Sequence, residues 1–397
     1  MKRKYRVVFP FVEAGMGHIV PMESVFHEFK KKYGYQCEII TTSFFRDTNS
    51  KGMSFVENEL IKEVKLHNKK KWRGKLQFFL MDIFKTKISL SFLFKVKYRK
   101  GYKDAINYLT QLQPDLIFHT HFATLYYACD ARKKFLIDSK SITFCPDPII
   151  GRQWDKRTDI ICLSSENGRK KASNEGFAKV ENIPFLLRND IFLYTKEKEE
   201  YRKEVGISID KFTILISDGA YGAGKIEESV NKLLTSTCQM TIIAICGKNQ
   251  ALYSRLIKKS VPSNITLKVY GFTDQMLTLS AASDIFIGKA GASNLAEVCY
   301  FGLPQIINFC ATPIEEWIAD YYVNDVKSAV YIDSIDLLFQ TVEEWINKPV
   351  LMNSLIASAR QHNQQNGASI LADYMWNELL DLDEKPMCKM QSELINE

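Results

Sequence analysis

The stretch that decides the fold is Asp284-Ile-Phe-Ile-Gly-Lys-Ala-Gly-Ala-Ser-Asn-Leu-Ala-Glu297. An apolar run ends at Ile287, small residues follow, and a helical pattern begins near Ser293. Glycine at positions 288 and 291 permits a tight turn and a close approach of the backbone to a ligand. The free N–H groups and partial positive charge of a helix start suit a diphosphate. The stretch therefore predicts a strand, a turn and an anion-binding helix.

Similar short apolar runs alternate with helical stretches along most of the chain. They cover 6–12, 37–42, 115–120, 141–145 and 159–164, and then 212–217, 240–246, 265–270, 284–287 and 305–309. Continuous apolar strands are typical of parallel sheets covered by helices on both faces. Alternation of strand and helix indicates right-handed βαβ units. The sequence predicts an α/β fold with two Rossmann-like, doubly wound parallel-sheet domains that face a cleft.

A break at 182–190 separates the two series of strands. We expect an N-terminal domain over 1–185 with a basic and aromatic insertion at 60–105, a C-terminal domain over 186–365, and a C-terminal segment over 366–397 with a polar tail. The 397 residues suit two domains. Ligands of such sheets bind at the carboxyl ends of the strands.

Composition excludes several classes of protein. Apolar content of 46% and charge of 25% are typical of globular proteins, and no run of about 18 apolar residues predicts a membrane span. The basic start lacks the apolar stretch of a signal peptide. Nine scattered cysteines without a C-x-x-C pair indicate a reducing cytoplasm and neither disulfides nor a zinc site.

Residues 62–103 hold fourteen Lys and Arg against two acidic residues, interleaved with aromatics that include Trp72, Phe78 and Phe79. Basic residues attract anionic headgroups and apolar rings insert at the interface. A solvated helix face or nucleic-acid binding are the alternatives. Because no RNA- or DNA-binding motif accompanies the segment, we expect an anionic membrane surface as the partner and no nucleic acid.

Residues Tyr270–Tyr322 resemble the donor-site signature of the GT-B glycosyltransferases that include the peptidoglycan N-acetylglucosaminyltransferase and the monogalactosyl- and glucosyl-diacylglycerol synthases. The matching positions, in order, are Gly271, Phe272, Met276, Ser283, Asp284, Lys289, Gly291, Glu297, Gly302 and Pro304. The resemblance implies a UDP-sugar co-substrate and no cofactor, with the uracil held by Phe272 and the ribose by Glu297. It also implies that a helix within 366–397 packs back on the N-terminal domain.

The end of the signature departs from that family. Pro313, Ile314 and Ile318 stand where relatives have Gly, Gln and Asn. The missing amides hydrogen-bond the donor sugar in those relatives, and isoleucine cannot. The identity of the sugar is therefore open, and Glu315 or Glu316 are the candidates to bind it.

A second glycine-rich loop, Ser217–Lys225, follows the strand at 212–217. It nearly spells a P-loop, but Ile226 leaves no hydroxyl for magnesium, which disfavours an ATPase. Either Ser293 or Asn294 is expected to cap the helix of the first motif. Donor contacts are predicted at Gly17, Ser217, Gly219, Gly222, Phe272, Lys289, Gly291, Ala292, Ser293, Asn294, Glu297, Glu315 and Glu316.

The N-terminal candidate is His18, in Gly15-Met-Gly17-His18 after the first strand. A helix start disfavours imidazolium, so His18 would stay neutral and able to accept a proton. A purely structural histidine is the alternative. The same Gly-x-Gly-His element lies beside the acceptor in the resembling families, and a Thr-Asp motif and a downstream Trp of the lipid enzymes resemble Asp147 and Trp154.

These features together predict an inverting, metal-independent transfer of a hexose from a UDP-sugar to a hydroxyl acceptor, a membrane lipid or lipid-linked precursor. His18 is the expected base, Asp147 is a second catalytic candidate, and no metal ligand is assigned. The expected location is cytoplasmic, peripheral on the inner face of the membrane. The alternatives are a soluble natural-product acceptor, a UDP-sugar epimerase, or a non-catalytic partner subunit.

Overall fold

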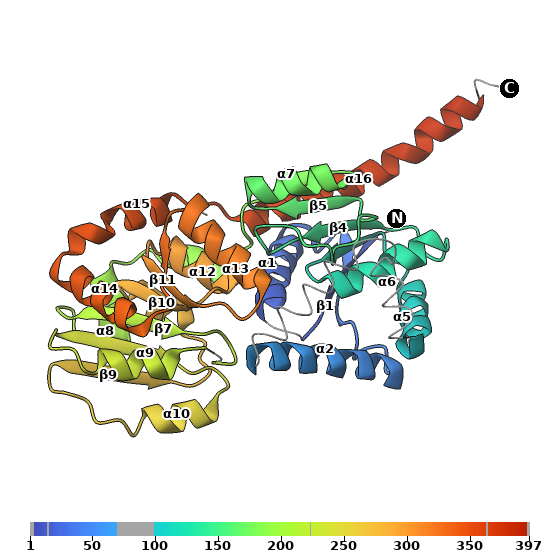
Figure 1. Ribbon diagram of the computed structural model, residues 1–397. Helices are drawn as coiled ribbons and strands as arrows, with labels where there is room; N and C mark the ends of the chain where they lie inside the picture. The colour runs from blue at the N-terminus through green and yellow to red at the C-terminus, as the bar shows by residue number, and fades with distance from the viewer. Residues whose placement is uncertain (1–3, 14–15, 70–98, 223, 363, 395–397) are drawn as a thin grey trace. The chain divides into compact units, whose positions relative to one another are not determined.

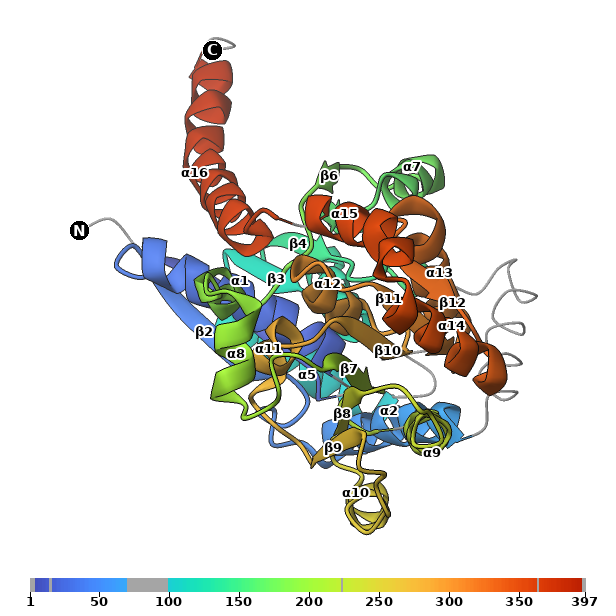
Figure 2. The same ribbon diagram turned by 90° about the vertical axis from the view of Figure 1, so that its left-hand side faces the viewer.

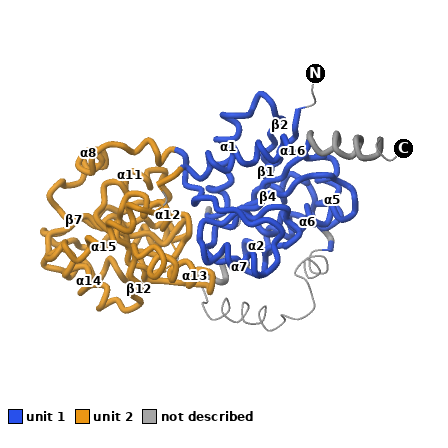
Figure 3. Tube along the Cα trace, turned by 90° about the horizontal axis from the view of Figure 1, so that it is seen from above, with its two compact units in different colours: residues 1–62, 85–189, 366–397 blue, residues 63–84, 190–365 orange. Residues whose placement is uncertain are grey.

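The computed structural model describes residues 4–13, 16–69, 99–222, 224–362 and 364–394. They form two compact units (Figure 3). Unit 1 gathers the described residues of 1–62, 85–189 and 366–397, and unit 2 gathers those of 63–84 and 190–365. Residues 70–98 of the predicted insertion at 60–105, with Trp72, Phe78 and Phe79, lie outside the described residues.

Unit 1 is built on a parallel six-stranded sheet with the order β2-β1-β3-β4-β5-β6. Figure 1 labels β1, β4 and β5 of this sheet. Its strands are β1 (Tyr5–Phe11), β2 (Cys37–Ser43), β3 (Leu116–His119), β4 (Lys140–Phe144), β5 (Ile160–Leu163) and β6 (Val180–Asn182). Its helices are α1 (Met16–Tyr33), α2 (Lys51–Lys69), α5 (Arg99–Leu112), α6 (Phe122–Lys133), α7 (Glu166–Glu175) and α16 (Gly367–Leu394). Of these, α2 belongs to unit 1 only as far as Lys62. The strand order reverses between β1 and β3, and the loops after two such strands form a crevice where ligands of doubly wound sheets bind.

Unit 2 has a second parallel sheet with the order β12-β11-β10-β7-β8-β9, which Figure 2 shows from one side. Its strands are β7 (Phe212–Ser217), β8 (Met240–Ile245), β9 (Ile265–Tyr270), β10 (Ile285–Lys289), β11 (Gln305–Phe309) and β12 (Ala329–Tyr331). Its α-helices are α8 (Lys198–Glu204), α9 (Ile226–Leu233), α10 (Gln250–Leu256), α11 (Met276–Ala281), α12 (Ala292–Tyr300), α13 (Pro313–Asp320), α14 (Ile335–Asn347) and α15 (Asn353–Gln361). Here the order reverses between β7 and β10.

Helices bury both faces of each sheet. Along β7, Leu215 packs in one apolar cluster, whereas Ile214 and Ile216 pack in the cluster on the opposite face. Successive side chains of a strand point to opposite faces, so a strand that is covered on both sides must be apolar at every position. This explains the uniform runs of the sequence, and the predicted fold class is confirmed.

All ten predicted strands are present, with bounds that differ by at most two residues. The sequence missed β6 (Val180–Asn182) and β12 (Ala329–Tyr331), which are three-residue strands at the edges of the sheets. An edge strand is covered less completely, and these two carry exposed or half-buried residues. They therefore lack the apolar run that revealed the others.

Helix α16 is held on unit 1 by side chains from several elements. Asp373 accepts hydrogen bonds from Lys32 Nζ (2.8 Å) and from Tyr33 Oη (2.6 Å). The Trp376 ring stacks on the ring of Tyr33, with the centroids 4.7 Å apart. The last turn of α1 therefore contacts α16 both through an ion pair and through stacked aromatic rings.

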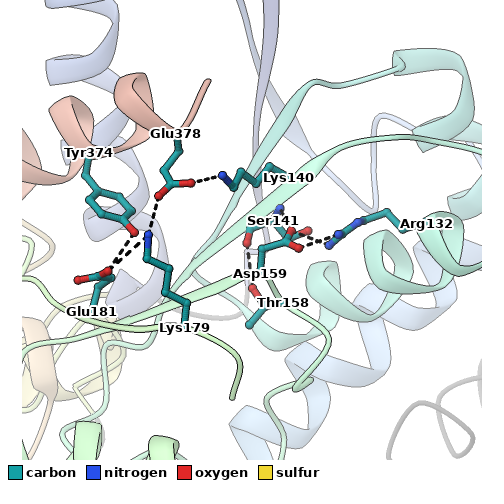
Figure 4. Close-up of polar contacts among 9 residues, drawn as sticks. All are labelled: Arg132, Lys140, Ser141, Thr158, Asp159, Lys179, Glu181, Tyr374 and Glu378. Carbon is teal, nitrogen blue, oxygen red and sulfur yellow. Dashed lines mark hydrogen bonds and ion pairs between the residues drawn. The ribbon is translucent and has the colours of Figure 1, made fainter. Parts of the chain in front are cut away.

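A second charged contact of α16 centres on Glu378, whose side chain is 8% exposed (Figure 4). Its carboxylate pairs with Lys140 at the start of β4 and with Lys179, at 2.8 Å, just before β6. Burial by itself raises the pKa of Glu378, but the hydrogen bonds from Lys140 and Lys179 together hold it below the usual value. The charged form of Glu378 is thus the one that stabilises the fold.

We predict that Glu378→Gln lowers the free energy of unfolding by about 3 kcal/mol, because it leaves the half-buried Lys140 ammonium without its counter-charge. The wild-type contribution is present above the ordinary Glu pKa of about 4.3 and is lost as the pH falls through the lowered folded-state value. Urea unfolding followed by circular dichroism measures it.

The control is Glu166→Gln, which removes an exposed pair with Lys170 on α7 and should leave the unfolding midpoint unchanged. Equal effects of the two substitutions would contradict the role assigned to Glu378.

Candidate active site

His18 lies in the first turn of α1, at the point where the strand order of unit 1 reverses. Its Nδ1 is 2.7 Å from the carbonyl oxygen of Thr120, which follows β3, and Thr120 Oγ1 donates to the carbonyl oxygen of His18 (2.7 Å). Because a carbonyl can only accept, Nδ1 of a neutral His18 carries the hydrogen. Its Nε2 then has the free lone pair that a proton acceptor needs.

Two further histidines lie close by at the end of β3. His121 is the N-cap of α6, and its Nδ1 accepts the N–H of Ala123 (3.2 Å). The ring centroids of His121 and His18 are 4.7 Å apart, with the rings nearly perpendicular. His119 is buried, and its Nδ1 lies 2.9 Å from Thr124 Oγ1.

Burial lowers the pKa of all three imidazoles and so favours their neutral form. It lowers the pKa of His18, although the hydrogen bond to Thr120 acts in the opposite direction. Burial also lowers the pKa of His121 well below its usual value, with a smaller contribution from His18. The pKa of His119 falls to about 3 through burial and, secondly, through Arg132. His18 is therefore chemically able to act as a general base.

The other predicted residues of unit 1 differ in their surroundings. A Cβ added to Gly17 would meet no protein atom within 4 Å, so packing does not require glycine there. Asp147 is half-buried after β4, and its carbonyl oxygen accepts from Cys145 Sγ. Trp154 is only 3% exposed and packs in the core against Phe122. Trp154 is thus part of the core of unit 1, and a contact of this residue with the acceptor stays a prediction.

In unit 2, the end of β10 runs unusually close to the end of β7. Gly288 pairs with Ser217 across the two strands, and a Cβ at position 288 would lie 2.1 Å from the Ser217 carbonyl oxygen. The sequence placed Gly288 in a turn after the strand. Instead Gly288 belongs to β10, which extends to Lys289. Only glycine at this position allows β10 to come so close to the backbone of β7.

Helix α12 begins at Ala292 with Gly291 as its N-cap, and no side chain caps it. The expectation that Ser293 or Asn294 would do so is wrong, because both lie inside the first turn, and the buried Oγ of Ser293 has no hydrogen-bond partner. The backbone N–H groups of this turn therefore have no capping side chain, as an anion-binding helix start requires. Glu297 lies further along the helix and is buried.

Lys289 is paired with Glu315 of α13, with Nζ and Oε1 2.8 Å apart and the side chains 17% and 14% exposed. The other oxygen of Glu315 accepts the N–H of Ala311 (2.5 Å). Glu315 thus fixes both Lys289 and the start of α13, whose N-cap is Thr312. Glu316 is the exposed neighbour of Glu315, and a role for either acid in sugar binding stays a prediction.

The two isoleucines that replace the amides of the signature serve packing. Ile318 is buried in the apolar core of unit 2, and Ile314 packs against the same core. Both side chains therefore contribute to the apolar core that α13 covers.

The glycine-rich loop after β7 is organised by Asp218, a residue that the sequence interpretation missed. Asp218 is 2% exposed and accepts the N–H of Ile226 at the start of α9 (3.1 Å). Burial raises the pKa of its carboxyl to about 6, although Lys289 acts to lower it. An acid directly after a strand and eight residues before the first residue of a helix was the available signal.

Two predicted glycines of this loop have backbone conformations that favour glycine. Gly219 has φ of 74°, and Gly222 has φ of 54° with a Cβ position 2.2 Å from the carbonyl oxygen of Cys246. Phe272, directly after Gly271 beyond β9, is 60% exposed. Within the described part of the chain, no group of three or more His, Cys, Asp or Glu side chains could hold a metal ion.

Comparison with known proteins identifies the class. Residues 213–373 match the glycosyltransferase family 28 C-terminal domain. The crystal structure of MurG from Acinetobacter baumannii superimposes with a TM-score of 0.62 at 18% identity, covering 94% of this chain and all of that one. The family match covers most of unit 2 and the first residues of α16. The similarity to MurG shows that the chain has the GT-B fold, which confirms the resemblance.

Two curated relatives illustrate the sequence similarity. A probable monogalactosyldiacylglycerol synthase 2 of Oryza sativa subsp. indica is 35% identical over 119 residues, 28% of this chain and 25% of that protein. A processive diacylglycerol beta-glucosyltransferase of Staphylococcus epidermidis is 27% identical over 212 residues, 52% of this chain and 53% of that protein. The chain thus spans a quarter to about half of these relatives. Among the described residues, no helix is long and apolar enough to cross a membrane.

Two glycines of the motif should respond differently to alanine. We predict that Gly288→Ala costs about 3 kcal/mol of folding stability or more, because its Cβ would overlap a backbone oxygen that cannot move away. Gly291→Ala should fold normally, since the nearest atom to its Cβ is 3.9 Å away, but should weaken UDP binding about tenfold if a phosphate approaches there.

Thermal melts and calorimetric titration with UDP check both expectations. A Gly291→Ala protein that melts normally and binds UDP as tightly as the wild type would show that the phosphate does not lie at this turn.

Proposed function

We propose that this protein is an inverting, metal-independent glycosyltransferase that moves a hexose from a UDP-sugar to the hydroxyl of a membrane lipid or lipid-linked acceptor. The observation that carries the proposal is the position of the family 28 match. It covers β7, β10 and the start of α12, which are the elements where unit 2 reverses its strand order and leaves helix N–H groups without a capping side chain.

The donor would be held mainly by backbone groups. The N–H groups at the start of α12 and the loop at Gly219–Gly222 attract the diphosphate, with Lys289 as the nearby cation. Glu297 would accept hydrogen bonds from the ribose hydroxyls, and Phe272 would hold the base. Helix N–H groups stabilise the charge of the departing UDP without a metal ion, which is why we propose metal independence.

His18 would act as the general base in unit 1. Its Nε2 takes the proton of the acceptor hydroxyl as the oxygen attacks the anomeric carbon, and the bond from that carbon to UDP breaks. The carbonyl of Thr120 keeps the hydrogen on Nδ1 and stabilises the imidazolium that forms. A single displacement of this kind inverts the anomeric configuration.

The names of the relatives support a lipid acceptor, because two of them describe synthesis on diacylglycerol. We therefore propose a peripheral location on the inner face of the membrane, with residues 62–103 as the contact. Three further predictions belong to this proposal. They are a cleft between the domains, a catalytic role for Asp147, and binding of the acceptor by the N-terminal domain and of the nucleotide-sugar by the C-terminal domain.

The test is the release of UDP from a panel of UDP-sugars, with and without a crude lipid extract. We expect release that depends on the extract, a glycosylated lipid product, and no loss of rate in EDTA. Conversion of the UDP-sugar without release of UDP would indicate the epimerase instead. Release with soluble acceptors alone would overturn the lipid assignment.

Replacement of His18 by Ala should lower kcat about 100- to 10,000-fold, the usual contribution of a general base, while the affinity for UDP stays unchanged. His27→Ala, an exposed histidine on the same helix, is the matched control and should keep full activity. Activity of His18→Ala within a few-fold of the wild type would remove His18 as the base.

The pH profile gives a separate check on His18. Because the pKa of His18 is lowered from its usual value near 6.5, the neutral base predominates at neutral pH. The value of kcat/KM should therefore stay constant from pH 8 down to about 6.5 and fall only below it. A rate that declines between pH 8 and 7 on acidification would contradict the lowered pKa.

A further inference from the structure

A second cluster of side chains lies at the carboxyl ends of three adjacent strands, β7, β8 and β9. Tyr221 belongs to the glycine-rich loop after β7, Lys248 follows β8, and Phe272 follows β9. The Lys248 ammonium is 5.9 Å from the centroid of the Tyr221 ring and 5.3 Å from that of Phe272. One cation thus contacts two aromatic rings from different loops.

The backbone around this cation is closely interlocked. The N–H of Lys248 donates to the carbonyl oxygen of Ala220 (2.8 Å). A Cβ at Gly247 would lie 2.4 Å from that same oxygen, and a Cβ at Gly222 would lie 2.2 Å from the carbonyl oxygen of Cys246. Both glycines are needed for the loops to approach so closely, so the position of Lys248 beside the glycine-rich loop is fixed by packing.

The cluster is accessible to a ligand. Lys248 is exposed, Tyr221 is half-buried, and 60% of the Phe272 surface is open to solvent. Exposed aromatic rings offer stacking surfaces for a nucleobase, but stacking does not distinguish one base from another because every base has a π-face. The Lys248 ammonium only donates hydrogen bonds and can therefore discriminate between base edges, whereas the Tyr221 hydroxyl can both donate and accept.

We propose that Lys248 is the specificity-determining residue for the nucleobase, selecting uracil over cytosine, an inference that rests on the proposed function. Its ammonium donates a hydrogen bond to the carbonyl oxygen at position 4 of uracil, while Tyr221 and Phe272 contact the ring. Cytosine carries an amino group at that position, which is itself a donor. A lysine has three donors and no acceptor, so it repels the amino group.

The same loop connects this cluster with the diphosphate region. Asp218, next to Gly219, lies close enough to Lys289 for the two charges to interact. The strand ends that carry Phe272 and Lys289 are separated by three strand spacings, about 14 Å. A nucleotide with its diphosphate at the start of α12 and its base on Phe272 would lie across these strand ends.

Calorimetric titration of the full chain with UDP and with CDP tests this assignment. The two ligands share the ribose and the diphosphate, so their ratio of affinities isolates the base. We expect the wild type to prefer UDP at least about tenfold, and Lys248→Met to weaken UDP about tenfold with little effect on CDP, so that the ratio approaches one.

Lys232→Met is the matched control. Its ammonium also lies 5.3 Å from an aromatic centroid, that of Phe339, elsewhere in unit 2, and its loss should leave both affinities unchanged. Phe272→Leu should weaken UDP and CDP alike and preserve their ratio. Melting curves of each variant confirm that it is folded before titration.

Three results would overturn the inference. An unchanged UDP-to-CDP ratio in Lys248→Met shows that Lys248 does not read the base. Equal weakening of both nucleotides in that variant shows that Lys248 serves the diphosphate. A folded wild type that binds neither nucleotide overturns the proposed function itself, whereas the first two results leave it standing.

Discussion

The candidate donor site depends on the close approach of β10 to β7, which glycine at position 288 makes possible. The carbonyl oxygen of Ser217 occupies the space that any other side chain would need. This contact brings the end of β10, and with it Lys289 and the start of α12, beside the glycine-rich loop. An anion at the proposed donor site would reach both sets of N–H groups because the two strands end so close together.

Both units place their candidate residues where the strand order reverses, for the same geometric reason. At such a point the chain leaves two neighbouring strands in opposite directions, so no helix covers the gap between the loops. In unit 1 the contact is polar: Thr120 binds His18 through two hydrogen bonds, one to the ring and one to the backbone. In unit 2 the contact between the two strands is steric, because the Ser217 carbonyl oxygen leaves no room for a side chain at Gly288.

The sequence predicted the features that follow from periodicity and from glycine. The buried strands were found because coverage on both faces demands apolar residues, whereas the short edge strands β6 and β12 escape that demand. Capping by Ser293 or Asn294 was wrong because β10 extends two residues further than its apolar run. The role of Asp218 and the burial of Trp154 depend on contacts between segments far apart in the chain, for which local sequence carries little signal.

The pairing of Lys289 with Glu315 affects how the candidate donor site could attract an anion. Each member of a half-buried pair offsets the charge of the other, so Lys289 contributes less net field than an unpaired lysine would. Attraction for a diphosphate then falls mainly to backbone N–H groups, whose positions are fixed by Gly288, Gly291 and the loop around Asp218. A site of this kind is sensitive to backbone geometry, and a single methyl group at its glycines can matter more than a change in surface charge.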